Sequence, residues 1–262
     1  AGESILLERG VPLPVDPVSV DGLVKLQGFT SEPLPYGIPH QRVRSVQLES
    51  PVPVGFWRSV GNSQHAFFVE SFIDEAAAAA GADPLAFRKR LLDGQARYLA
   101  VLDRLETAAD WGRPSVDGAG QGAAFSYAYD SVIGTVAEAT LSEGRVRVHR
   151  VTCVVDCGTV INPDHVKAQI EGGIIFGLGP ALNNVINFED GRVVESNFHD
   201  YVMPVMADVP EITTHLMDSD VAPGGVGELS VGTVAPAIAN AVFAATGTRI
   251  RRLPIHRALA EG

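Results

Sequence analysis

Hydrophobic residues recur at helical spacing over residues 62–109. In NSQHAFFVESFIDEAAAAAG they stand at Phe67, Phe68, Phe72, Ile73 and Ala76. This spacing predicts a helix, with Ser63 as its N-cap and Gly81 as its stop signal. Asp83, which a proline follows, predicts the start of a second helix that ends at Gly94, and a third helix is expected over about 96–109.

Beyond residue 120 the hydrophobic pattern changes to alternation. AAFSYAYDSVIGTVAEATL and RVRVHRVTCVVD, joined by the turn SEG, predict a strong antiparallel hairpin that is apolar on one face. Asn162 and the proline after it predict a helix, PDHVKAQIEGGIIFGLGPAL, whose glycines indicate close packing. Short strands are expected in NVINFEDGRVVES and EITTHLM, and a last helix in APAIANAVFAATG. Because strands and helices are grouped rather than alternating, the predicted fold class is α+β.

The same pattern predicts how the chain is organised. Residues 1–55 are rich in Pro and Gly and are expected to form an extended arm and linker that lies over another part of the protein. Residues 56–262 then form the main body. Within it, a helical segment at 63–110 precedes an α+β segment at 120–262.

Composition excludes several classes of function. The chain has 262 residues, of which 46% are hydrophobic and 19% charged, and its formal net charge is -11. This acidic balance, without a dense Lys/Arg cluster, argues against a nucleic-acid partner. No membrane span is expected, because glycines and turn signals interrupt every long apolar run, and AGESILLERG lacks the pattern of a signal peptide.

The two cysteines, Cys153 and Cys157, lie four positions apart in a predicted strand. That spacing separates them by about 13 Å, too far for a disulfide. No second Cys/His pair follows them, so a metal site is disfavoured and two buried thiols are expected.

Three short segments contain candidate chemistry, and each also has a plain structural interpretation. In PGGVGELS, glycines would let the backbone approach a ligand, and a carboxylate among apolar neighbours has its ionisation disfavoured, so Glu228 is a candidate general base. It is equally well explained as a solvated turn carboxylate. Arg58, beside Trp57, offers a planar fork for an anion or a polarised oxygen, although a lone Arg is more often a salt-bridged scaffold residue. Gln169 can donate to and accept from a heterocycle edge, although most helical Gln side chains are merely exposed.

Taken together, these segments resemble the molybdenum-binding subunit of the xanthine oxidase family, in particular the isoquinoline 1-oxidoreductase beta-subunit and aldehyde dehydrogenase branch. The similarity is carried by GFWRSVG, VDCGTVINPDHVKAQIEGG, SNFHDYVMP and GGVGE with APAIANAVFAATG, and it covers nearly the whole chain. It implies a molybdopterin-binding fold of antiparallel sheets with packed helices. Residues 56–262 would be the C-terminal part of that domain.

The resemblance also implies roles for individual residues. Glu228 matches the family's glutamate that acts as general base beside the metal while a water-derived oxygen enters the substrate. The positions that match cofactor-binding residues are Phe56, Trp57, Arg58, Gln169, Gly225 and Gly227. Of these, residues 56–58 would line the metal pocket and Gln169 would hydrogen-bond the pterin. No residue of the chain is expected to ligate the metal directly.

The sequence departs from the family in three places. Val60 stands where purine-oxidising members have a phenylalanine, which argues against a purine substrate. The second pterin loop of the family is missing, since Gly120-Gln121-Gly122 only imitates it and leads into a predicted strand. The chain also lacks the cysteines that ligate iron–sulfur clusters.

These departures predict a heteromeric assembly. The expected cofactor is a molybdenum-pterin group, in its plain or cytosine-dinucleotide form, with iron–sulfur clusters only in a partner subunit. The expected partners are the rest of the molybdenum-binding subunit as another chain, an iron–sulfur subunit, a cytochrome c or another electron acceptor, and a small aldehyde or N-heteroaromatic substrate. The chain could be separately encoded or a cleavage product, and either a cytoplasmic or a periplasmic location fits.

Two other functions compete with the enzyme. A non-catalytic scaffold subunit of such an assembly would bind no cofactor, but the presence of both Glu228 and Arg58 favours the enzyme. A nicotinamide dehydrogenase is disfavoured, because no glycine fingerprint follows a strand and opens a helix within a βαβ unit.

Overall fold

The computed structural model describes residues 35–40, 52 and 55–261. Its helices are α3 (Val60–Ala79), α4 (Pro84–Leu91), α5 (Ala96–Ala108), α6 (Pro163–Leu182), α7 (Val231–Thr246) and α8 (Ile255–Glu261). Its strands are β1 (Gly120–Ala128), β2 (Ser131–Ser142), β3 (Arg145–Asp156), β4 (Phe188–Glu189), β5 (Arg192–Val193) and β6 (Glu211–Leu216), and η1 (Met206–Asp208) is a short 3-10 helix. The α+β prediction is confirmed.

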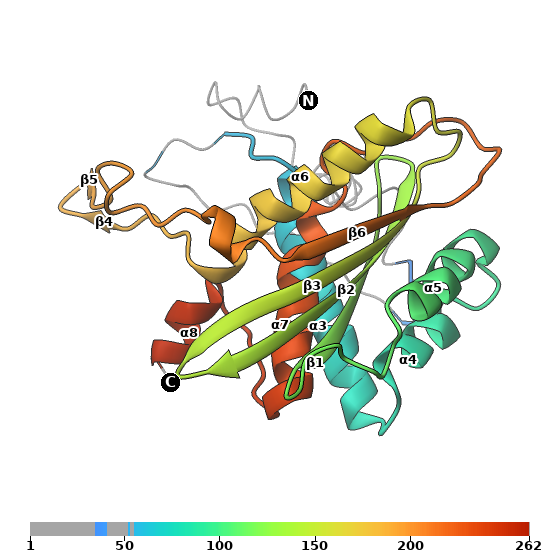
Figure 1. Ribbon diagram of the computed structural model, residues 1–262, viewed down its shortest axis with the longest axis horizontal. Helices are drawn as coiled ribbons and strands as arrows, with labels where there is room; N and C mark the ends of the chain where they lie inside the picture. Colours follow the sequence, from blue (N-terminus) through green and yellow to red (C-terminus); the bar gives the residue numbers. More distant parts are fainter. Residues whose placement is uncertain (1–34, 41–51, 53–54, 262) are drawn as a thin grey trace.

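The main sheet has the strand order β1-β2-β3-β6. The first three strands form an antiparallel meander, and β6 joins the edge of β3 in parallel. Strands β4 and β5 pair only with each other, on an arm that extends away from the sheet (Figure 1). Figure 1 also shows α6 running alongside the sheet, on the side away from α4 and α5.

Helices cover both faces of the antiparallel meander, so the prediction of one apolar face is wrong. Ala124 of β1 belongs to the core formed with α6 and α7. The next residue, Phe125, belongs to a second core formed with α4 and α5. The stretch expected to be one strand is also divided, because Tyr129 and Asp130 both have positive φ and form a tight turn between β1 and β2.

The start and the buried face of α3 also differ from prediction. The helix begins at Val60, and the Ser63 hydroxyl donates to the Val60 carbonyl from inside the first turn, so Ser63 is not the N-cap. Phe68 and Phe72 are 60% and 65% exposed, whereas Glu70 is buried. The helical period was therefore right, but polar groups occupy part of the face that packs inward.

A buried ionic network explains that inversion. Arg88 is fully buried, and its Nε lies 2.8 Å from Glu70, while its Nη1 lies 3.6 Å from Asp74. Glu70 also accepts hydrogen bonds from the Tyr36 hydroxyl at 2.6 Å and from the Phe125 amide at 2.9 Å. The network joins α3, α4 and β1. Tyr36 belongs to the predicted arm, residues 1–55. Most of that arm lies outside the described residues, so its boundary at residue 55 stays a prediction.

Most other local predictions are confirmed. Asp83 caps α4 through the Ala86 amide, and Asn162 caps α6 through the His165 amide at 3.0 Å. Both cysteines are buried and free, and burial raises the pKa of Cys153 to about 12. No helix among the described residues is long and apolar enough to span a membrane.

The Gly120-Gln121-Gly122 segment lies within β1 and serves helix packing. A Cβ on Gly122 would lie 2.1 Å from the Ala241 amide nitrogen of α7, so only glycine permits this approach. Gln121 is buried and donates to Glu138 at 2.9 Å. These contacts give the segment a structural explanation.

Replacing Arg88 by Met should destabilise the fold by about 3–5 kcal/mol, because it leaves Glu70 buried without its cation and leaves Asp74 with Arg249 as its remaining ion-pair partner. Urea unfolding measures the loss. Arg90→Met is the matched control on the same helix, since Arg90 is exposed, and it should cost less than about 1 kcal/mol. Equal effects of the two substitutions would contradict a structural role for the network.

Candidate functional site

The candidate site lies where the chain before α3 meets α6 and residues 223–228, the glycine turn before α7. The Arg58 guanidinium joins these segments: its Nε donates to the Gly227 carbonyl at 2.6 Å. Its Nη2 lies 3.2 Å from both the backbone carbonyl and the side-chain Oε1 of Gln169. No ion pair of Arg58 occurs among the described residues, so the salt-bridged alternative is not what this geometry shows. Three of the predicted residues are thereby brought together.

Glu228 is fixed in the same cluster. Its Oε1 accepts a hydrogen bond from the Ser59 backbone amide at 2.7 Å, and the residue is half-buried. Ser59 is fully buried and has a φ of 80°, and Val60 has a φ of 45°. Such backbone costs about 1–3 kcal/mol per residue and is concentrated at functional sites. The strained turn directs the Ser59 amide at the Glu228 carboxylate.

Close helix packing holds the two halves of the cluster in place. The Ser230 hydroxyl donates to the Ile170 carbonyl of α6 at 2.9 Å. Gly173 faces the same hydroxyl so closely that a Cβ there would lie 2.2 Å from Ser230 Oγ. One turn later Gly177 packs against Val234 in the same way. The prediction that glycines of α6 reflect close packing is confirmed at Gly173 and Gly177 but not at Gly172, where a Cβ would meet nothing within 4 Å. The packing at Gly173 and Gly177 sets where Glu228 stands relative to Gln169.

The β1–β2 turn packs against the glycine turn. The Gly225 amide donates to the Tyr129 carbonyl at 2.7 Å, and a Cβ on Gly225 would lie 2.9 Å from the Tyr129 Cβ. The Tyr129 hydroxyl is buried without a hydrogen bond of ordinary geometry. Burial raises its pKa, the negative charge of Glu228 raises it further, and the nearby Ser59 side chain lowers it. Tyr129 therefore lies close to the Glu228 cluster.

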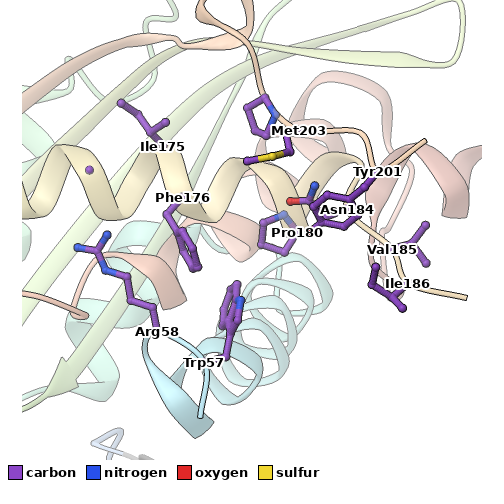
Figure 2. Close-up of a pocket in the computed structure, with 12 residues that line it drawn as sticks. Trp57, Arg58, Ile175, Phe176, Pro180, Asn184, Val185, Ile186, Tyr201 and Met203 are labelled. Atoms are coloured by element: carbon purple, nitrogen blue, oxygen red, sulfur yellow. The ribbon is translucent and has the colours of Figure 1, made fainter. Parts of the chain in front are cut away.

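A pocket of about 500 Å³ opens beside Arg58. Its walls are mostly apolar and come from residues 57–58, from α6 and from the segment after it; they include Ile175, Phe176, Pro180, Asn184, Val185, Ile186, Tyr201, Met203 and Pro204. The rings of Trp57 and Phe176 are tilted by 39° with centroids 4.8 Å apart (Figure 2). The Arg58 guanidinium lies 5.8 Å from the Phe176 centroid. Arg58 thus links the pocket to the Glu228 cluster.

The predicted residues do not all converge equally. Arg58, Gln169, Gly227 and Glu228 form one hydrogen-bonded cluster, and Trp57 lines the pocket. Phe56 is 61% exposed and is not among the pocket residues. Gly225 contacts the β1–β2 turn. In the described part of the chain, no group of three or more His, Cys, Asp or Glu side chains is placed to hold a metal ion.

Sequence reasoning missed four residues of this region. Phe176 is two helical turns after Gln169, so helical spacing could have shown that it shares the same face of α6. Ser59 contributes its backbone amide and Ser230 a contact between helices, neither of which residue type reveals. Tyr129 lies in a turn without the Asn or Gly that marks such turns in a sequence.

Comparison with known proteins identifies two matching domain families. Residues 71–210 match a family of molybdopterin cofactor-binding domains, and residues 20–92 match a second family of the same description. Arg58 and Gln169 lie inside these matches, whereas Glu228 lies beyond both.

Individual relatives extend the similarity over most of the chain. It is 40% identical to isoquinoline 1-oxidoreductase subunit beta of Brevundimonas diminuta over 232 residues, which are 86% of this chain and 30% of that protein. It is 33% identical to the membrane-bound aldehyde dehydrogenase [pyrroloquinoline-quinone] of Gluconacetobacter polyoxogenes, over 83% of this chain and 31% of that protein. The chain therefore spans about a third of the length of these relatives.

A solved structure confirms the fold. Quinoline 2-oxidoreductase from Pseudomonas putida 86 superposes with a TM-score of 0.71 at 16% identity, over 80% of this chain and 53% of that one. At this identity the likeness concerns the fold alone.

Adjacent glycines of α6 test the helix contact that positions the site. Gly173→Ala should destabilise the protein by about 1–3 kcal/mol, because its Cβ overlaps Ser230 Oγ. Gly172→Ala should instead stabilise it by up to about 1 kcal/mol, since a Cβ at Gly172 meets nothing within 4 Å and alanine favours a helix. Urea unfolding of both variants gives the comparison, and a neutral Gly173→Ala would mean that the two helices are not in this contact.

Proposed function

Because the chain belongs to the family of molybdopterin cofactor-binding domains, we propose that it is the C-terminal part of the molybdenum-binding subunit of a hydroxylase. The enzyme oxidises an aldehyde or an N-heteroaromatic compound by inserting a water-derived oxygen. The observation that carries the proposal is the cluster in which Arg58 and Ser59 hold Gln169, Gly227 and Glu228 together from three distant segments.

The residues of this cluster fit a molybdenum-pterin group. Gln169 is exposed, and its Oε1 accepts from Arg58, which leaves its amide nitrogen to donate to a heterocycle edge. Gly227 presents bare backbone, and a Cβ there would lie 3.7 Å from Gln169 Oε1, so the space above the turn is open. Since no cluster of metal-ligating side chains occurs in the described part of the chain, these residues would hold the group through its organic part.

When bound, the group would supply the two-electron redox chemistry that accompanies insertion of a water-derived oxygen. The chain supplies the base and its orientation. The Ser59 amide holds Oε1 of Glu228, and Oε2 accepts no hydrogen bond within the described part of the chain. Oε2 is therefore the atom that takes up a proton when the oxygen nucleophile forms. Arg58 fixes the turn by binding the Gly227 carbonyl, so the carboxylate does not have to be reoriented during the reaction.

The pocket beside Arg58 supports a flat, uncharged substrate. Trp57 and Phe176 form a tilted aromatic pair at one wall, and Asn184 offers an amide on the other side. Val60 is not among the residues that line this pocket, and the preference for small aldehydes and one-ring or two-ring heteroaromatics over purines rests on the family resemblance at that position. The relatives named for isoquinoline and for aldehyde oxidation agree with this class.

The chain spans about a third of the length of its relatives, and the partner proposed for it is the remaining part of the molybdenum-binding subunit as another chain. Iron–sulfur clusters would lie in a partner subunit and pass electrons to a cytochrome c or another acceptor. The cofactor is proposed in its plain or cytosine-dinucleotide form.

The surface of the chain supports a large apolar interface with that polypeptide. Large hydrophobic side chains are exposed along the end of α6 and the segment after it: Ile175, Phe176, Ile186, Phe188, Val193, Val194, Phe198, Val202, Met203, Val205 and Met206. Exposed apolar side chains gathered in one part of the chain are typical of an interaction site. Several of these residues line the pocket, and others belong to β4, β5 and the chain around them, which Figure 1 shows as an arm (Figures 1 and 2). The partner would therefore close the pocket and cover the arm together.

Expressed alone, the chain should aggregate or remain free of cofactor, because its apolar surface is uncovered and its pocket is open. Co-expression with the polypeptide that supplies the rest of the subunit should give a soluble, molybdenum-loaded complex. Metal and pterin analysis of both preparations, with pyrroloquinoline quinone measured in parallel, provides the test. A monomer of this chain alone that carries molybdenum and pterin would overturn the proposed assembly.

Glu228→Gln keeps the size and hydrogen-bonding reach of the side chain but cannot accept a proton. The rate at which the substrate reduces the metal in a single turnover should fall by at least about 10²–10⁴-fold, the usual contribution of a general base. Molybdenum content should stay at the wild-type level, because the side chain is not a metal ligand. Both quantities are measured in one preparation of the complex, with isoquinoline and benzaldehyde as probe substrates.

Glu211→Gln is the matched control, since Glu211 is an exposed carboxylate at the start of β6. It should change neither quantity. A Glu228→Gln complex that is fully loaded and reduced at the wild-type rate would remove Glu228 from the mechanism. Loss of loading with normal turnover of the loaded sites would show a structural carboxylate instead.

A further inference from the structure

The β1–β2 turn has a feature that the proposed mechanism does not use. Tyr129 and Asp130 occupy both central positions of the turn with φ of 57° and 60°. Glycine and asparagine favour this conformation, whereas a tyrosine side chain is sterically disfavoured there. The turn alone therefore gives no reason for a tyrosine, and the reason has to lie in what the phenol contacts.

The turn is pressed against the glycine turn that carries Glu228. The Gly225 amide donates to the Tyr129 carbonyl at 2.7 Å. On Gly224, a Cβ would lie 2.8 Å from the Asp130 carbonyl oxygen and 2.4 Å from the Ser131 hydroxyl. Glycine is needed at both places because the two turns touch through their backbones. Any movement of Tyr129 is therefore transmitted to the Glu228 turn.

The Tyr129 hydroxyl lies near the Ser59 side chain. The oxygen is buried and has no hydrogen bond of ordinary geometry within the described part of the chain. The pKa of the phenol is raised by burial first and by the charge of Glu228 second, and the Ser59 side chain lowers it. On Glu228, Oε1 is bound by Ser59, and Oε2 accepts no hydrogen bond among the described residues. The buried phenol oxygen, which makes no hydrogen bond of ordinary geometry, thus lies within electrostatic range of a carboxylate whose Oε2 accepts no hydrogen bond in the described part of the chain.

We propose that the Tyr129 hydroxyl donates a hydrogen bond to the Glu228 carboxylate in the assembled enzyme and is a positioning residue for this base. The assignment rests on the proposed role of Glu228. The phenol and the Ser59 amide would then both hold the carboxylate, so that it keeps one orientation and its charged form is favoured until it takes up a proton.

Other charged groups surround the two turns and are accounted for. Arg58 binds the carbonyl of Gly227. Arg97 forms an ion pair with Asp156 at 2.9 Å and also donates to the Asp130 carbonyl at 3.1 Å. The Asp130 carboxylate accepts from the Tyr127 hydroxyl at 3.3 Å. Among the charged groups, only Glu228 acts on the pKa of Tyr129.

Tyr129→Phe removes one oxygen atom and tests the assignment in the purified complex. Because the lost hydrogen bond favoured the charged carboxylate, the acid limb of the kcat/KM profile should move to higher pH by about one unit. The plateau should fall by less than tenfold, with benzaldehyde and isoquinoline as probes. Tyr127→Phe, two residues earlier near the end of β1, is the matched control and should leave the profile in place.

A second measurement does not depend on activity. The complex is labelled with 3-fluorotyrosine, whose phenol ionises at lower pH than that of tyrosine, and the fluorine resonance of residue 129 is assigned by its loss in Tyr129→Phe. In Glu228→Gln this resonance should titrate at lower pH than in the wild type, because the negative charge is gone. The resonance lost in Tyr127→Phe should titrate unchanged.

The two measurements separate the failure of this assignment from the failure of the proposed function. If the resonance of residue 129 titrates identically in Glu228→Gln and wild type, the two side chains do not interact and the assignment is wrong. If that coupling is present but Tyr129→Phe leaves the pH profile of an active complex unchanged, Tyr129 does not position the base. A complex that shows the coupling but oxidises no substrate would overturn the hydroxylase function while leaving the contact intact.

Discussion

The position of Glu228 depends on hydrogen bonds from a backbone turn that is itself strained. Ser59 and Val60 adopt left-handed conformations that neither residue favours, and the Ser59 amide and the Arg58 side chain then bind the turn at 227–228. A strained turn persists only when its surroundings determine it. Here those surroundings are α6 and α7, which approach closely at Gly173 and Ser230 and leave no room for another arrangement.

Local elements of this fold could be read from the sequence because their signals are short in range. The capping residues Asp83 and Asn162 placed α4 and α6 correctly, and the glycine after the last apolar stretch ended α7. The convergence of Arg58, Gln169 and Glu228 could not be derived from composition or spacing. It came from the resemblance to a known family, because Arg58 is 111 residues from Gln169 and 169 residues from Gly227.

The errors have a common physical cause, which is the tertiary environment. An alternating strand pattern does not show whether the less apolar face of the sheet is exposed to water. In the meander, helices cover both faces. On α3, apolar periodicity could not show that Glu70 faces inward while Phe68 faces outward. The inward carboxylate is stable there only because Arg88, which belongs to another helix, is buried beside it. That pairing is invisible until the helices are docked.

Strain and exposure are distributed so that this chain and the partner proposed for it would contribute different features to the site. The segments that position Glu228 are closely packed through glycines and largely buried. Where the chain has only to enclose a ligand, it exposes apolar side chains on an arm with few contacts of its own. If the proposed partner completes the pocket, the closed pocket would form only on assembly, because burying the arm would supply the free energy that also excludes water from the pocket. The chain would therefore fix the orientation of the base before assembly, while the dry environment in which that base works would come only with the partner.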